Sequence, residues 1–158
     1  MRIAVFLLAL CAPLPALALS CIAPSVERTY QEVNEAKEEY IVVHGRLTLD
    51  QSKLPSDGTL DSNPPKMTMV PATLNGLSLG KSGFHVPFDQ NIRLEVACFG
   101  PWCGSVANGA DVLAFLRRDE GTYALHVNPC GGHVFAPAKQ AQLKQVRQCF
   151  SGGPCKVK

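Results

Sequence analysis

The sequence lacks a strong excess of charge of either sign, and this limits the partners that it fits. Its 158 residues hold 15 lysines and arginines against 13 aspartates and glutamates, a formal net charge of +2 at pH 7. Proteins that bind nucleic acid through its phosphates need a basic patch or stripe. The basic residues here are dispersed along the chain, so we expect no nucleic-acid partner.

Long apolar runs are also scarce, and the longest lies in the N-terminal leader Met1–Ser20. This leader has one positive charge at Arg2, then the apolar run Ile3–Leu10, then prolines and small residues. Such a segment is typical of a signal peptide, and it is too short and too interrupted by proline to span a bilayer. We therefore predict export, with no membrane span after the leader is removed.

Cleavage of the leader is expected after Ala18 or after Ser20. Residues 21–158 then have the size of one ordinary domain, which we expect to be secreted or periplasmic. A lipoprotein is the alternative, because Cys21 stands where a lipid-anchored cysteine can stand. The preceding residues lack the usual leucine three positions back, so we favour a structural half-cystine at Cys21.

Cysteines are the most informative residues that the chain has. Cys11 leaves with the leader, and the mature chain keeps six, an even number: Cys21, Cys98, Cys103, Cys130, Cys149 and Cys155. In an oxidising compartment an even set of cysteines predicts disulfides.

Hydrophobic periodicity predicts a helix at each end of the mature chain and strands between them. The first helix is expected over Pro24–Lys37 with Ser25 as its cap, and the last from Pro137, with Leu143, Val146 and Phe150 on its apolar face. The expected strands are Glu39–Asp50 with a bulge at Gly45, Met67–Leu74, Gly76–Phe88, a clean alternation from Asn91, and a hairpin of Asp111–Arg118 with Gly121–Asn128. Residues Gln51–Lys66 are expected to form a loop. This layout favours a mainly β barrel or sandwich over a βαβ fold.

Two cysteines invite a redox interpretation. Trp102-Cys103-Gly104 echoes the thioredoxin active site, whose chemistry needs two cysteines separated by two residues at the start of a helix. The residue three after Cys103 is Val106, and Cys98 lies five residues before it at the end of a strand. We therefore favour a structural disulfide, and keep an extracytoplasmic thiol–disulfide oxidoreductase using Cys98 and Cys103 as the alternative function.

The histidines give weak signals. His126, Cys130 and His133 have metal-like spacing, but disulfide formation competes for the thiol and a fourth ligand has no obvious source, so we expect no metal and no cofactor. His44 and His85 are isolated. No catalytic triad, carboxylate pair or phosphate-binding loop stands out, although the members of a triad can be distant in sequence. We expect no catalytic residues and a protein that is not an enzyme.

The order of features resembles the netrin-like domain of the tissue inhibitors of metalloproteinases. The matching features are Cys21-Ile-Ala-Pro24, the strand Tyr40-Ile-Val-Val-His-Gly45, Cys98 at a strand end, and a hairpin whose second strand runs into Cys130. The resemblance covers most of the mature chain except Gln51–Gly83. It implies a five-to-six-stranded antiparallel OB-like barrel with flanking N- and C-terminal helices.

The resemblance also implies a non-enzymatic binding module for an unidentified extracytoplasmic protein or ligand, with protease inhibition as one form. Those inhibitors begin with Cys-Thr-Cys and present the first cysteine to the protease zinc. Cleavage after Ala18 would put Leu19 in that place and make Cys21 the second cysteine of the motif.

The disulfide prediction follows from the turns and from the resemblance. Cys149 with Cys155, and Cys98 with Cys103, enclose short turns that can bring the two Cα atoms within bonding range. Cys21 and Cys130 remain, and they match the pair that fastens the N-terminal segment to the barrel in the resembling family.

Overall fold

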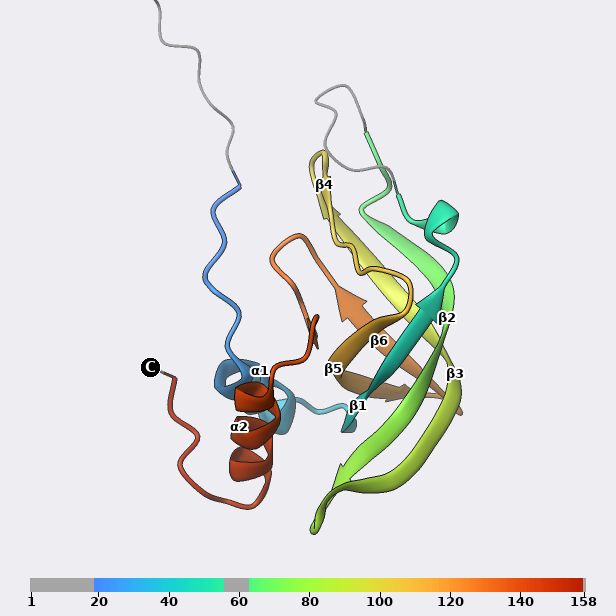
Figure 1. Ribbon diagram of the computed structural model, residues 1–158. Helices are drawn as coiled ribbons and strands as arrows, with labels where there is room; N and C mark the ends of the chain where they lie inside the picture. Colours follow the sequence, from blue (N-terminus) through green and yellow to red (C-terminus); the bar gives the residue numbers. More distant parts are fainter. Residues whose placement is uncertain (1–18, 56–62, 158) are drawn as a thin grey trace, which may run out of the picture.

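The computed structural model describes residues 19–55 and 63–157, which form one sheet with two helices beside it (Figure 1). Residues 1–18 of the predicted signal peptide, and residues 56–62 of the predicted loop, lie outside this part of the chain. The elements are α1 (Val26–Glu35), β1 (Tyr40–Leu49), the 3₁₀ helix η1 (Gln51–Lys53), β2 (Met67–Gly80), β3 (Gly83–Phe99), β4 (Trp102–Cys103), β5 (Ala110–Asp119), β6 (Thr122–Val127), β7 (Val134–Phe135) and α2 (Gln140–Phe150). The mainly β prediction with terminal helices is confirmed.

The strand order is β1-β2-β3-β6-β5-β7, and β1 also pairs with β5. The prediction of an all-antiparallel sheet is wrong, because β3 and β6 run parallel, with Leu94 opposite Leu125. The connections explain this direction. Two hairpin reversals make β3 parallel to β1, while β5 lies antiparallel to β1 and β6 reverses again after β5. β6 must therefore run in the direction of β3.

The predicted break at Gly76 is also wrong, because β2 continues through it to Gly80. β2 and β3 form one long hairpin whose turn is Lys81-Ser82, and this hairpin projects at the lower end of the molecule (Figure 1). The predicted bulge at Gly45 is absent from the β1 registers, while a register shift occurs at Ser78/Leu79. Gly45 instead allows the backbones of β1 and β2 to approach each other closely.

The hairpin of β5 and β6 is confirmed, with Asp119 opposite Thr122. The turn residues Glu120 and Gly121 both have positive φ, 41° and 86°. Two successive left-handed residues twist a tight turn in the direction that matches paired strands.

Two apolar clusters form the core. The larger lies between the inner faces of the strands and includes Leu47, Leu74 and Leu94, each 0% exposed. The smaller lies between the helices and the outer face of β5, where Phe115 is buried against side chains of α1 and α2. Burial of apolar area on the outer face of β5 therefore holds the helices to the sheet.

The helix predictions are correct in kind and differ at the ends. α1 begins after the predicted cap Ser25, whose Oγ accepts from the backbone N–H of Arg28 at 3.3 Å. α2 begins at Gln140 and not at Pro137, because the Ala138 N–H is still bonded to the Asp111 carbonyl of β5 at 3.0 Å.

The apolar face of α2 also differs from the prediction. Leu143 and Val146 are buried as expected, but Phe150 is 41% exposed. Cys149 is buried in its place because it belongs to a disulfide beside α1. No described helix is long and apolar enough to cross a membrane.

Candidate functional site

Three disulfides fasten the described part of the chain. They join Cys21 to Cys130, Cys98 to Cys103 and Cys149 to Cys155, with Cα–Cα distances of 5.4, 4.0 and 4.8 Å. These are the pairs named from the sequence. The Cys21–Cys130 bond attaches the start of the described chain to the segment that follows β6.

Residues Ile22–Ser25, called the N-terminal segment below, run from this disulfide to the first turn of α1. The segment is fixed at its far end by Ser25, which caps α1 and donates a hydrogen bond to the Glu27 carboxylate at 2.7 Å. Ile22, in contrast, is 74% exposed. A large apolar side chain is thus presented to solvent by a short segment that is held at both ends.

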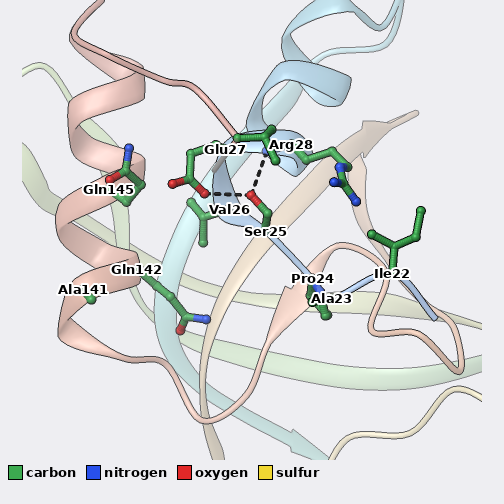
Figure 2. A pocket seen from close by; sticks show the side chains of 11 residues that line it. Ile22, Ala23, Pro24, Ser25, Val26, Glu27, Arg28, Ala141, Gln142 and Gln145 are labelled. Atoms are coloured by element: carbon green, nitrogen blue, oxygen red, sulfur yellow. Dashed lines mark hydrogen bonds between the residues drawn. The ribbon is translucent and has the colours of Figure 1, made fainter.

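A cleft lies on each side of the N-terminal segment. One, of about 510 Å³, separates the segment and the start of α1 from α2 and Val157. Figure 2 shows Gln142 and Gln145 of α2 facing the start of α1, with Ile22 at the far end of this cleft. The other, of about 280 Å³, separates the segment from His126 of β6 and from His133 in the connection between β6 and β7. A partner that contacts Ile22 can therefore place side chains on both sides of it.

The two histidines pack against each other beside the Cys21–Cys130 bond, with ring centroids 5.7 Å apart. Burial lowers the pKa of His133 to about 4, helped by the neighbouring His126 and Arg117. Burial also lowers the pKa of His126. Both rings are therefore neutral near pH 7 and contribute no charge to the cleft.

The sequence suggests His126, Cys130 and His133 as a possible set of metal ligands. Cys130 cannot supply a thiolate to such a set, because its sulfur is bonded to Cys21. Within residues 19–55 and 63–157 no three metal-ligating side chains gather. The isolated histidines lie elsewhere: His44 is 3.1 Å from a carboxylate oxygen of Asp111, and the Nδ1 of His85 is 2.7 Å from the Gly83 carbonyl oxygen.

A charged cluster that the sequence analysis did not predict lies on the outer face of β3 and β5. Glu95 is 7% exposed and accepts hydrogen bonds from Arg117 at 2.7 Å and from Arg93 at 3.2 Å. Asp119 also pairs with Arg93, so two cations and two anions neutralise one another. The alternation from Asn91 places Arg93 and Glu95 on one face of β3, but only the sheet order, with β6 between β3 and β5, brings Arg117 within reach of them. This neutral cluster offers no net charge to bind an anion.

Cys98 and Cys103 are 6% and 4% exposed and lie opposite each other on β3 and β4. A redox disulfide is attacked by an external thiolate and usually has its nucleophile at a helix start. The burial and the strand location here do not favour the oxidoreductase hypothesis.

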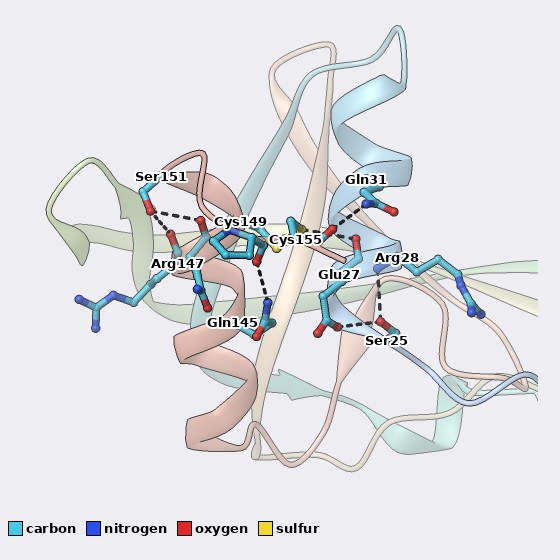
Figure 3. The surroundings of a disulfide bond; sticks show 11 residues. Ser25, Glu27, Arg28, Gln31, Gln145, Arg147, Cys149, Ser151 and Cys155 are labelled. Atoms are coloured by element: carbon cyan, nitrogen blue, oxygen red, sulfur yellow. Dashed lines mark hydrogen bonds between the residues drawn. A yellow bond between two sulfur atoms is a disulfide. The ribbon is translucent and has the colours of Figure 1, made fainter. Parts of the chain in front are cut away.

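The third disulfide ties the C-terminal turn to α2, where Cys149 lies, and hydrogen bonds connect the same turn to α1. Figure 3 shows this turn between the two helices: the Gln31 amide of α1 donates to the Cys155 carbonyl at 2.7 Å, and Gln145 of α2 donates to the Pro154 carbonyl at 3.3 Å. The turn therefore ties both helices together behind the N-terminal segment.

No protein-family model, curated protein or solved structure matches this chain. Function is therefore inferred from the site itself.

Proposed function

We propose that this protein is an exported, non-enzymatic binding module built on an OB-type barrel of the netrin-like kind. The strand order supports the fold, since β1, β2, β3, β6 and β5 pair in turn and β5 pairs again with β1. A five-stranded sheet that returns to its first strand matches the OB arrangement. The three disulfides support a secreted or periplasmic location, because such bonds persist in oxidising compartments.

The observation that carries the proposal is Ile22, which is 74% exposed on a segment fixed by a disulfide and a helix cap. A few side chains that become fully buried in a partner carry most of the binding energy of an interface. A segment that is already ordered loses little conformational entropy on binding. The N-terminal segment with its two clefts is therefore the proposed contact surface for an extracytoplasmic protein.

Protease inhibition is the form of binding to test first, since the resembling family inhibits metalloproteases. The test begins with the mature protein from an oxidising expression host, whose N-terminus and disulfides are established by mass spectrometry. Its binding and inhibition are then measured against a panel of extracytoplasmic metalloproteases and serine proteases, beside Ile22→Asp. Val86→Asp is the matched control, because Val86 is also exposed, at 45%, but lies on the β2–β3 hairpin.

We expect at least one panel member to bind, with an affinity that falls about ten-fold or more in Ile22→Asp and stays unchanged in Val86→Asp. An equal loss of affinity in both variants, or an affinity that Ile22→Asp leaves unchanged, would place the contact elsewhere. Hydrolase or oxidoreductase turnover by the purified protein without any binding would overturn the proposal.

A further inference from the structure

Two surface clefts meet at the carboxyl end of α2. One, of about 450 Å³, lies over the connection between α1 and β1, and the other, of about 500 Å³, lies between α2 and the β2–β3 turn. Leu79 and Phe150 line both. The clefts therefore form one continuous region, called the Phe150 surface below, with an apolar centre where Phe150 is 41% exposed.

One end of the Phe150 surface is basic. Lys81 comes from the β2–β3 turn, and Lys144 and Arg147 come from α2. The side chain of Arg147 reaches the β2–β3 turn, where a Cβ on Gly83 would lie 3.3 Å from the Arg147 Nε (Figure 3 labels Arg147). All three cations are exposed, and none has an ion-pair partner among the described residues.

The other end is acidic. Glu38 and Glu39 line the cleft over the α1–β1 connection, and Glu35 stands exposed between the lining residues Asn34 and Ala36. Glu39 is 3.4 Å from Arg118, while Glu35 and Glu38 have no ion pair in the described part of the chain. Lys37 is also exposed there, so the three carboxylates exceed the two cations Lys37 and Arg118 by one charge. The surface thus has unpaired cations at one end, an excess of carboxylates at the other and an aromatic ring between them.

We propose that the Phe150 surface is the interface of a homodimer, with a two-fold axis near Phe150. A two-fold axis sets each residue i of one copy against a residue j of the other, and j against i. An axis at the apolar centre therefore brings the basic end of each copy onto the acidic end of its partner. It also covers Phe150 with an equivalent ring, and aromatic residues are enriched at interfaces.

A small anion at the basic end fits these observations less well. It would leave the exposed Phe150 and the carboxylates without a role. It would also sit at the carboxyl end of α2, where the helix dipole disfavours negative charge. A second copy uses all three parts of the surface.

The dimer is independent of the proposed binding function. Ile22 shares a cleft with Ala141 and Gln142 at the start of α2, whereas Phe150 is the last residue of that helix. The clefts beside Ile22 and the Phe150 surface also share no lining residue. The N-terminal segment stays free in the dimer.

The first experiment is sedimentation velocity of the mature, disulfide-intact protein from low to high micromolar concentration. We expect a concentration-dependent shift from one copy to two, weakened at high ionic strength. Phe150→Asp is expected to weaken self-association about ten-fold or more, while Val86→Asp leaves it unchanged. Circular dichroism and thermal melting show that each variant folds. A wild-type protein that stays monomeric throughout, or a dimer that Phe150→Asp does not weaken, would overturn the proposal.

The second experiment tests the predicted charge pairing. The variants Lys81→Glu/Lys144→Glu and Glu35→Lys/Glu38→Lys are each expected to be monomeric, because the substituted side chains then face groups of the same charge on the other copy. In an equimolar mixture each pairing joins opposite charges again, so a heterodimer should form. Heterodimer formation detects this two-fold arrangement specifically, and its absence when both variants are folded and monomeric would exclude it.

Discussion

Gly45 of β1 and Gly76 of β2 face each other so closely that neither strand could carry a side chain there. They are register partners, and a Cβ on Gly45 would lie 2.3 Å from the Asn75 carbonyl oxygen, while one on Gly76 would lie 2.2 Å from the His44 carbonyl oxygen. The neighbouring atoms are backbone, which cannot rotate away as a side chain can. β1 can approach β2 this closely while still pairing with β5 only because both residues are glycine.

Gly45→Ala and Gly76→Ala are therefore each expected to destabilise the domain by about 3 kcal/mol or more, or to prevent folding. The matched control is Gly152→Ala, where φ is +78° and no atom lies within 4 Å of the added Cβ. That change carries only the cost of a left-handed residue, about 1 kcal/mol. Urea unfolding followed by circular dichroism measures the difference, and a similar loss in all three variants would contradict the close approach.

Glu95 is expected to contribute more stability than an exposed carboxylate does. It is 7% exposed and lies between Arg93 and Arg117. Glu95→Ala removes an anion that both half-buried cations contact, so we expect the free energy of unfolding to fall by about 1–3 kcal/mol. The control is Glu39→Ala, which removes an exposed pair with Arg118 worth less than about 1 kcal/mol. Chemical denaturation of both variants checks this. Equal losses would mean that the cluster is as well solvated as the exposed pair.

The three disulfides are expected to differ in their contribution. Cys21–Cys130 spans 109 residues and Cys149–Cys155 only 6. Loop-closure entropy then gives about 5 kcal/mol for the first and about 2 kcal/mol for the second. We expect the paired variant Cys21→Ser/Cys130→Ser to melt well below Cys149→Ser/Cys155→Ser. Equal melting losses would show that native contacts of the C-terminal turn, and not chain entropy, dominate.

His133 is expected to make stability fall as the pH drops. Its pKa is about 4 in the folded protein against an ordinary 6.5, so the unfolded chain binds more protons between these values. The free energy of unfolding therefore decreases from about pH 6.5 down to about pH 4, by on the order of 3 kcal/mol, with no further change from this group below.

Unfolding of His133→Phe in urea across that pH range should show a shallower decrease than the wild type shows. Ser105→Ala, at an exposed position that does not titrate, is the control and should keep the wild-type slope. A parallel pH dependence in His133→Phe and the wild type would assign the acid sensitivity to other groups.

Features that depend on nearby residues were predictable from the sequence. The cap at Ser25, the hairpin through Glu120 and Gly121, and the short Cys149–Cys155 turn involve residues that are close in the chain. Spacing and intrinsic preference determine such contacts, since the partners cannot separate far. The Cys21–Cys130 pair came from elimination and resemblance, because its members are 109 residues apart.

Features that depend on strand order were decided by the tertiary structure alone. The parallel pairing of β3 with β6 places Glu95 next to His126, and the same order brings Arg117 of β5 within reach of Glu95. No spacing within one strand encodes which strand lies beside it. Likewise, Phe150 has the position of a buried residue in the helical pattern, yet it is exposed because the Cys149 disulfide occupies the contact with α1. The periodicity determined that α2 has an apolar face, and packing decided which residues that face buries.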